Sequence, residues 1–424
     1  MITRRNWVLK KKVWAIMLVA AFWAVNLESA WCEPIKIGMV YPMSGAMATV
    51  TEGIIAAHKA AGAEINKKGG LLGRPVEFVM RDDNGNPELS TRYCRELIMK
   101  EKAAWVTGGF GSAVGLAAAA VAGELKSPIF VYGGGAEKIT MEEWNPYMIR
   151  YRFTTAAESY ACVRVLAESV LKGVKDPTIY WISWDYEYGR SLHKPFVTKL
   201  KEMIPNAKII GEAWPRVGES DYGPFIQQMV ARKPTVVINA IWGGGVVSLL
   251  KQGAGYGLWD VTKLVAMTGL GGIEYRIAIG KDMPAETWTN CYEDYVWPDN
   301  EEQRAYYRAI QEFTGKPGMN YSNGAGMYYA VKHIAKGVEK AKTLEPLKVI
   351  QAMKEIPFHT YWGEMKIRDF DHQVTSGAVW APMVKKQGVD YLVLDASRLK
   401  YFPCDSDLYT KEEWTAARKA AGKK

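Results

Sequence analysis

Short apolar runs alternate with longer amphipathic stretches along the first part of the chain. After residue 33 the apolar runs predict buried strands, and the stretches between them repeat every three to four residues, as amphipathic helices do. Strands alternating with helices specify a parallel sheet with helices on both faces. We expect strands at 35–41, 76–81, 104–107 and 129–132, and helices at 52–67, 87–100 and 112–125.

The same alternation restarts near residue 156 and predicts a second α/β unit. Two series of similar length indicate two similar lobes rather than one very wide sheet. Here we expect helices at 156–171, 188–203, 223–231 and 244–254, and strands at 178–183, 208–214, 236–240 and 264–267.

The last third of the chain changes its pattern. Helical spacing continues at 301–314, 321–341 and 347–354, and a period of two then predicts a β-ribbon at 361–367, 379–385 and 389–394. The polar segment 401–424 predicts a surface helix after Thr410. No repeat of 20–50 residues is present, which excludes solenoids.

The first 32 residues have the order of an export signal. Basic residues at positions 4, 5 and 10–12 precede an apolar run at 13–25, which is shorter than the roughly 20 residues that a spanning helix needs. Small residues follow the run, so we expect cleavage near Cys32 and a periplasmic mature protein. Cys32 as a lipid-anchored first residue is an alternative, and the bulky Trp31 before it argues against it.

Composition narrows the class of protein further. The chain has 424 residues, of which 48% are hydrophobic and 23% charged, which suits two or three folded domains. The net charge of +9 falls to about +5 without residues 1–32, which carry five basic and one acidic side chain. This small positive net charge is spread along the chain and does not indicate a nucleic-acid partner. We expect no metal and no cofactor, because only five His and no C-x-x-C motif are present.

Four cysteines remain after the predicted cleavage. An even number in an oxidising compartment permits one or two disulfides, and four cysteines allow three full pairings. The sequence leaves open how they pair: Cys94, Cys162, Cys291 and Cys404.

Glycine-rich loops follow the predicted strands in both lobes. In open parallel sheets, ligands bind at the carboxyl ends of the strands. Glycine lets backbone N–H groups approach a ligand, and a helix beginning there favours an anion. Any one loop could be an ordinary strand-to-helix turn, but all of them together predict a cleft between the lobes: 42–46, 108–112, 133–137, 184–189, 242–245 and 268–272.

Two enzymatic interpretations are disfavoured. Residues 109–115 are like a dinucleotide-binding fingerprint, but their spacing is one residue too long and no acidic residue ends the following strand. Ser112 as a nucleophile lacks a matching His and acid, and a hydrolase would need His58, His193 or His333 in the cleft beside a Ser or carboxylate. We therefore expect no catalytic residue.

Several motifs carry a family resemblance. Segments 34–38, 42–45, 65–76 and 81–87, with 185–189 and 220–225 in the second lobe, resemble the branched-chain amino-acid-binding (leucine/isoleucine/valine-binding) family of periplasmic ABC-transporter substrate-binding proteins. The resemblance covers about 34–394 and implies the type I periplasmic binding fold: two Rossmann-like α/β lobes with three hinge crossings. The corresponding division is a signal peptide at 1–32, lobe one at 33–153 and 286–355, lobe two at 154–285 and 356–400, and a tail at 401–424.

The resemblance also implies site residues. In amino-acid-binding members, a Ser after the third strand and a small residue plus a Thr after the fourth hold the α-carboxylate, and the matching positions are Ser112, Gly134 and Ala136. A second-lobe Glu binds the α-ammonium in those members, and Thr268 stands in its place. A buried ammonium without a partner is costly, so a ligand without one fits better, unless Glu137 supplies the charge.

The expected function is that of a receptor that closes two lobes on a small ligand. We expect a polar or carboxylate-bearing ligand with an aromatic or branched body, not a standard branched-chain amino acid, delivered by a monomer to an inner-membrane ABC permease. A ligand-sensing protein of the same fold acting in signalling is the alternative. Aromatic cover and a second-lobe hydrogen bond complete the candidate ligand-binding set: Phe110, Ser112, Tyr132, Gly134, Gly135, Ala136, Glu137, Tyr188, Trp242 and Thr268.

Overall fold

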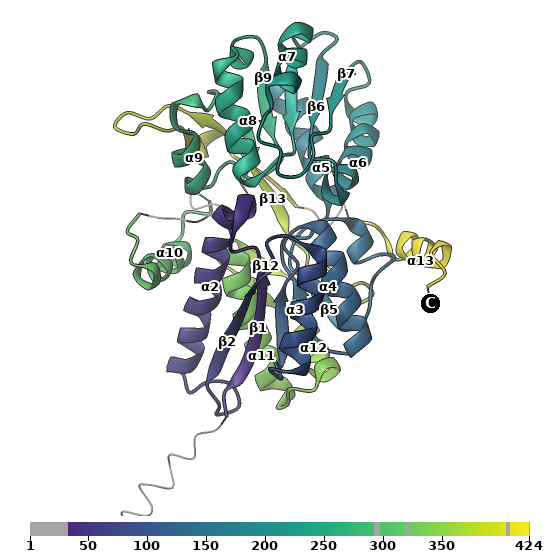
Figure 1. Cartoon of the computed structure of the whole chain (residues 1–424), viewed down its shortest axis with the longest axis vertical. Helices are drawn as coiled ribbons and strands as arrows, with labels where there is room; N and C mark the ends of the chain where they lie inside the picture. The colour runs from purple at the N-terminus through teal and green to yellow at the C-terminus, as the bar shows by residue number, and fades with distance from the viewer. Residues whose placement is uncertain (1–32, 292–296, 319–320, 322–323, 404–407, 424) are drawn as a thin grey trace, which may run out of the picture.

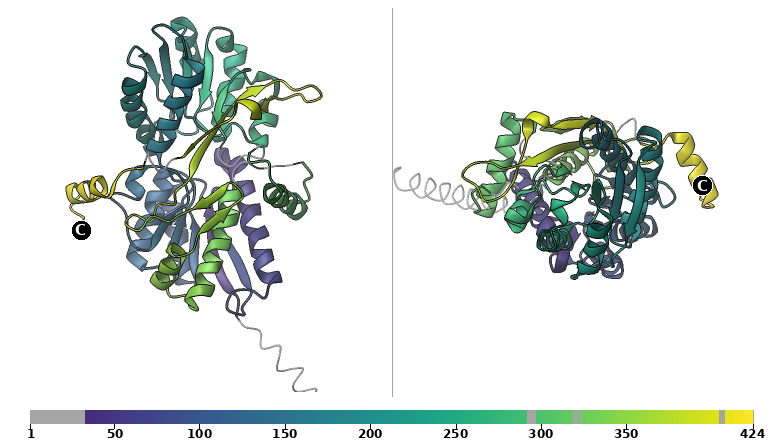
Figure 2. Two further views of the ribbon diagram at one scale, coloured as in Figure 1. Left: turned by 180° about the vertical axis from the view of Figure 1, so that it is seen from behind. Right: turned by 90° about the horizontal axis from the view of Figure 1, so that it is seen from above.

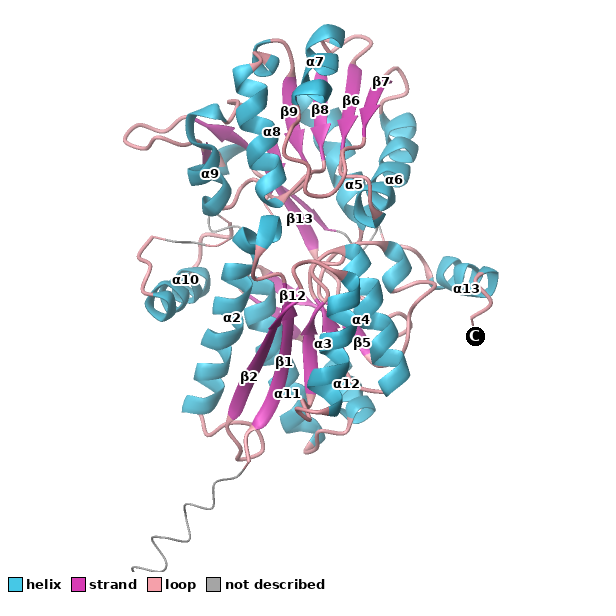
Figure 3. Ribbon diagram, viewed as in Figure 1, coloured by secondary structure: helices cyan, strands magenta, loops and turns pink. Residues whose placement is uncertain are grey.

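The computed structural model describes residues 33–291, 297–318, 321, 324–403 and 408–423. They form two lobes, one above the other in Figure 1, each built around its own sheet. Figure 3 shows helices on both faces of the two sheets, so the expected α/β architecture is confirmed.

The first sheet has five parallel strands in the order β2-β1-β3-β4-β5. Successive side chains of β1 enter the cores on opposite faces, as Met39 and Val40 do. Helices α2 and α11 pack together on one face, and α3 and α4 pack together on the other. The bounds are β1 Ile35–Tyr41, β2 Val76–Asp82, β3 Trp105–Gly108, β4 Ile129–Val131, β5 Met148–Arg150, α2 Ala48–Lys67, α3 Pro87–Met99, α4 Ser112–Leu125 and α11 Ala325–Ala341.

The second sheet runs β14-β13-β10-β9-β8-β6-β7, and β15 also pairs with β13. Strand β13 is antiparallel to β10, β14 and β15, whereas β10, β9, β8, β6 and β7 are parallel. The bounds are β6 Thr178–Ile182, β7 Lys208–Ala213, β8 Val236–Asn239, β9 Lys263–Ala266, β10 Trp288–Asn290, β13 Gly377–Val384, β14 Val393–Leu394, β15 Lys400–Pro403, α5 Thr155–Val165, α6 Glu187–Met203, α7 Gly223–Arg232, α8 Gly243–Gly255 and α9 Ile273–Ile279.

The chain passes between the lobes after β5, after β10 and before β13, as the resemblance implied. The first and third crossings lie side by side through a parallel bridge between Arg150 and Gln373. Arg150 Nε donates to Gln373 Oε1 at 2.5 Å, and Gln373 Nε2 donates to the carbonyl of Arg152 at 2.6 Å. These two side-chain hydrogen bonds hold two of the three crossings together.

Two short segments shift the expected boundaries of the lobes. Strand β10, which the predicted division places in lobe one, pairs with β9 and β13 in the second sheet. The hairpin of β11 (Phe358–Thr360) and β12 (Gly363–Met365), expected in lobe two, packs against α11 of the first lobe. We propose that lobe two includes β10 and resumes at β13 rather than at residue 356. The remaining helices, α10 (Glu301–Thr314) and α12 (Pro346–Lys354), pack on α2 and α11.

The C-terminal segment returns to the first lobe. Helix α13 (Lys411–Ala420) begins after Thr410, as predicted, but the expected tail boundary at 401 falls inside β15. Trp414 Nε1 donates to the carbonyl of Thr140 at 2.9 Å, and Arg418 Nη1 donates to that of Trp144 at 3.0 Å. Figure 2 shows this helix at the side of the molecule, so a segment that follows a second-sheet strand is anchored on lobe one.

Two of the four cysteines form no disulfide. Cys94 in α3 and Cys162 in α5 are buried and free, so of the possibilities left open by the sequence, two disulfides are excluded. Burial raises the pKa of the Cys94 thiol to about 12, which makes it inert at neutral pH. Cys404 lies outside the described residues.

Candidate ligand-binding site

A cleft lies where the strands of the two sheets end facing each other. The first lobe contributes the loops after β3 and β4, and the second contributes the loops after β6, β8 and β9. The space between them, counted together with the open solvent at its mouth, is about 390 Å³. Its lining residues are Val50, Phe110, Gly111, Gly133, Arg152, Tyr186, Tyr188, Trp242, Thr268 and Tyr275.

Aromatic rings from both lobes meet across this cleft. Phe110 of the first lobe and Trp242 of the second lie edge to face, with 5.6 Å between their ring centroids. Trp242 Nε1 donates to the Tyr186 hydroxyl at 2.6 Å, which fixes the indole. Gly133 has a φ of 108°, and a Cβ there would lie 2.3 Å from the Phe110 ring. Glycine at this position is therefore needed for the Phe110 ring to take its place.

A buried ion pair lies at the hinge side of the cleft. Arg152, on the first crossing, places Nη2 at 3.3 Å from both carboxylate oxygens of Glu158 in α5. The Tyr188 hydroxyl donates to Glu158 Oε2 at 2.8 Å, and Asn290 Nδ2 donates to Oε1 at 3.3 Å. The Glu158 side chain is 0% exposed and that of Arg152 is 12% exposed. This network joins the first crossing, α5, α6 and the end of β10.

Five of the ten predicted residues line empty space near the lobe interface. Phe110, Tyr188, Trp242 and Thr268 line the cleft, and Tyr132 lines a larger chamber beside it. The Thr268 hydroxyl donates to the carbonyl of Ile241 at 2.7 Å. The second-lobe hydroxyl that we expected to meet the ligand is therefore engaged within its own lobe.

The other five predicted residues shape the loop behind the cleft. Ser112 Oγ accepts hydrogen bonds from the backbone N–H groups of Gly135 (3.2 Å) and Ala136 (3.1 Å). Gly134 packs against Ile139, where a Cβ would lie 2.8 Å from the Ile139 side chain. None of these residues, nor Glu137, is among the lining residues of the cleft.

Glu137 serves as a cap of the second lobe's first helix. Its carboxylate accepts from the Thr155 hydroxyl and from the Ala156 N–H, both at 2.5 Å. A carboxylate at the beginning of a helix is favoured by the N-terminal dipole. This placement does not suit the role of replacement ammonium partner that we considered for Glu137.

Sequence reasoning missed Arg152 and Glu158. Arg152 lies one residue before the predicted end of the first lobe segment, between Tyr151 and Phe153. A cation flanked by aromatic residues at a lobe boundary could have indicated a ligand-binding residue. The sequence contains no such signal for Glu158, because nothing in the pattern of α5 indicates that this acidic side chain is buried.

The structure also bears on three other features considered from the sequence: the tryptophan of the loop 184–189, the histidines of a hydrolase and a metal site. Trp184, the first residue of the loop 184–189 that we expect to border the cleft, is fully buried in the second lobe and donates through Nε1 to the Tyr222 hydroxyl at 3.1 Å. None of the three histidines that a hydrolase would need is among the cleft's lining residues: His58, His193 and His333. Among the described residues, no group of three or more His, Cys, Asp or Glu side chains could hold a metal ion.

Two lobes joined by three crossings, with a cleft between opposed strand ends, define a ligand-binding protein of the two-lobed type. The chain belongs to the family described as periplasmic binding protein, which matches residues 34–388. Leu/Ile/Val-binding protein homolog 7 of Brucella abortus is 26% identical over 340 residues, covering 76% of this chain and 81% of that protein. Within the described residues, no helix is both long and apolar enough to cross a bilayer.

Solved structures show the same fold. A periplasmic binding protein from Burkholderia mallei matches with a TM-score of 0.78 and 24% identity, covering 90% of this chain and 98% of that chain. A solute-binding protein of an ABC transporter from Rhodopseudomonas palustris HaA2, in complex with p-hydroxybenzoic acid, matches with a TM-score of 0.75 and 22% identity, covering 90% and 100%.

Proposed function

We propose that this protein is the periplasmic receptor of an ABC importer and that it delivers a small aromatic carboxylate to an inner-membrane permease. The protein binds its ligand without chemical change. Closure of the two lobes is the signal that the permease reads, because a ligand stabilises the closed state only through contacts with both lobes.

The composition of the cleft carries this proposal. Arg152 is the only charged side chain among the described residues that line the cleft. Five aromatic rings line the same cleft: those of Phe110, Tyr186, Tyr188, Trp242 and Tyr275. Aromatic faces suit a flat apolar body, and a guanidinium suits a carboxylate. The Rhodopseudomonas neighbour, which is in complex with p-hydroxybenzoic acid, supports the same ligand class.

A charge-removing double variant tests the role of Arg152. Arg152→Gln with Glu158→Gln replaces the ion pair by two amides and leaves no unpaired buried charge. The wild-type protein should bind benzoate about 10- to 150-fold more tightly than benzamide. This ratio corresponds to the free energy of a charge-assisted hydrogen bond, about 1.5–3 kcal/mol. Calorimetry on the double variant should show no such preference.

The exposed pair Arg95–Glu124 provides the matched control, because its side chains are 43% and 48% exposed. The same two amide substitutions there should leave the preference for benzoate intact. Equal wild-type affinities for benzoate and benzamide, or a preference that survives in the Arg152/Glu158 double variant, would remove Arg152 from the site.

Trp242 should report ligand binding by fluorescence. Its indole touches Phe110 of the opposite lobe, so a ligand entering between them should change its emission. With 4-hydroxybenzoate as the probe, Trp242→Phe should lose most of the wild-type change. Trp259→Phe is the control, because Trp259 bonds to the carbonyl of Leu250 within the second lobe and does not line the cleft. An unchanged response and affinity in Trp242→Phe would contradict the proposed cleft.

The export signal leads to a separate prediction. The mature protein should begin within a few residues of Glu33 and be released from the periplasm by osmotic shock, because residues 1–32 have the basic, apolar and small-residue order of a signal peptide. N-terminal sequencing of the released protein checks this. Recovery of a protein that still begins at Met1 from the cytosolic fraction would contradict it.

A further inference from the structure

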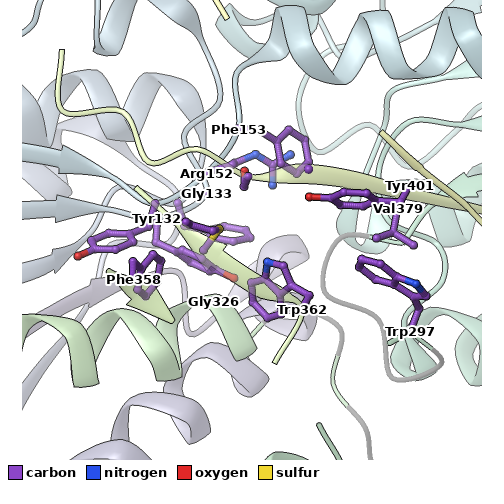
Figure 4. A pocket seen from close by; sticks show the side chains of 15 residues that line it. Tyr132, Gly133, Arg152, Phe153, Trp297, Gly326, Phe358, Trp362, Val379 and Tyr401 are labelled. Carbon is purple, nitrogen blue, oxygen red and sulfur yellow. The ribbon is translucent and has the colours of Figure 1, made fainter. Parts of the chain in front are cut away.

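A larger chamber adjoins the cleft on its hinge side. Counted together with the open solvent at its mouth, it spans about 710 Å³, and it shares Phe110, Gly133 and Arg152 with the cleft. Figure 4 shows Tyr132 and Phe358 toward one end, Trp297 and Tyr401 toward the other, and Arg152 between them. Arg152 therefore lies at the junction of two ring-lined spaces.

All three crossings between the lobes contribute to the walls of this chamber. Residues 151–153 come from the first crossing and Trp297 from the second. Ser376, Gly377 and Val379 come from the third crossing and the start of β13. Trp297 and Tyr401 stack with 4.8 Å between their centroids. A group bound in the chamber would touch the segments about which the lobes move.

The chamber has the features of a ligand subsite rather than of a packing defect. Protein interiors are close-packed and contain few voids larger than a water molecule, so an open chamber at the interface between two lobes needs an explanation. Its walls are mainly aromatic and aliphatic. Ser376, one of the lining residues, has a buried Oγ with no hydrogen-bond partner among the described residues, and such groups are usually satisfied.

We infer that the chamber binds a second apolar arm of the ligand, so that the preferred ligand is a carboxylate with an aromatic group on each side. The carboxylate meets Arg152 at the junction, one arm lies among the cleft aromatics and the other enters the chamber. This inference rests on the proposed function, because it takes the carboxylate at Arg152 as its fixed point. A ligand with one arm leaves the chamber unused and forfeits the burial of one ring.

Phenylacetate and diphenylacetate are matched probes for this inference, since they differ by one phenyl arm on the same carbon. Calorimetry should show that the wild-type protein binds diphenylacetate roughly tenfold or more tightly than phenylacetate, as expected for burial of an additional ring. Val379→Phe places extra volume in the chamber, because Val379 lines it and is 3% exposed. This variant should lose the advantage of diphenylacetate while binding phenylacetate within about twofold of wild type.

Val384→Phe, at the far end of the same strand, is the control and should retain the wild-type ratio. Met365→Phe, on β12, is a second chamber-filling variant for use if Val379→Phe does not fold. If the wild-type protein binds phenylacetate but gains nothing from the second arm, or if the filled variants keep the advantage, the inference is overturned and the proposed function stands. If the wild-type protein binds neither phenylacetate nor diphenylacetate, both the inference and the proposed function are overturned.

Discussion

Replacing Glu158 by leucine should lower the free energy of unfolding by about 3–5 kcal/mol, the largest effect that we expect from one substitution near the cleft. The Glu158 carboxylate is fully buried and lies 3.3 Å from Arg152, which is itself largely buried. Leucine would leave the Arg152 guanidinium in a low-dielectric site without its anion. It would also remove the acceptor that the Tyr188 hydroxyl uses at 2.8 Å. Urea unfolding followed by circular dichroism measures the loss.

Two comparisons separate the buried charge from other effects of the substitution. Glu124→Leu removes the anion of the exposed Arg95 pair and should cost less than about 1 kcal/mol. Pairing Glu158→Leu with Arg152→Leu should recover a large part of the loss, because neither charge is then buried alone. If Glu158→Leu proves no more destabilising than Glu124→Leu, the buried pair does not have the energetic role assigned here.

The lobes could be predicted because parallel sheets with helices on both faces leave a strong sequence signal. Strand β1 reads as an apolar run because both of its faces are covered, and the structure places it at the predicted residues 35–41. Strand β10 has three residues and pairs with one parallel and one antiparallel neighbour. A segment that short has no readable period, so its place in the second sheet depends on tertiary pairing.

The candidate site was predictable in part for the same reason. Tyr188 and Trp242 follow the ends of β6 and β8, and strand ends of a parallel sheet mark where ligands meet it. Ser112 also follows a strand end, but its hydroxyl holds the next loop, and only the folded positions of the Gly135 and Ala136 N–H groups reveal this. Arg152 and Glu158 act together across a crossing, so neither position could be interpreted without the other.

Leucine should bind this protein about 10- to 150-fold more weakly than its deaminated counterpart, 4-methyl-2-oxopentanoate. The two ligands share a carboxylate and a branched body and differ in the α-ammonium. The resemblance implies that Thr268 occupies the position at which the amino-acid binders keep a carboxylate, and its hydroxyl donates to the carbonyl of Ile241. Burial of the ammonium in the cleft would add its desolvation cost. Side-by-side calorimetric titrations at pH 7 measure the ratio.

If leucine proved to be the tighter ligand, its ammonium could bind one of two carboxylates near the interface, that of Glu137 or that of Glu158. Glu137 accepts bonds from Thr155 and Ala156 at the beginning of α5, so Glu137→Gln should leave the affinities for both ligands unchanged. Glu158 is in contact with Arg152 and Tyr188, both of which line the cleft. Micromolar binding of leucine that is lost in Glu137→Gln would contradict the capping role, and binding lost only in Glu158→Gln would make Glu158 the ammonium partner. Either result would replace the aromatic carboxylate by an amino acid as the ligand of this receptor.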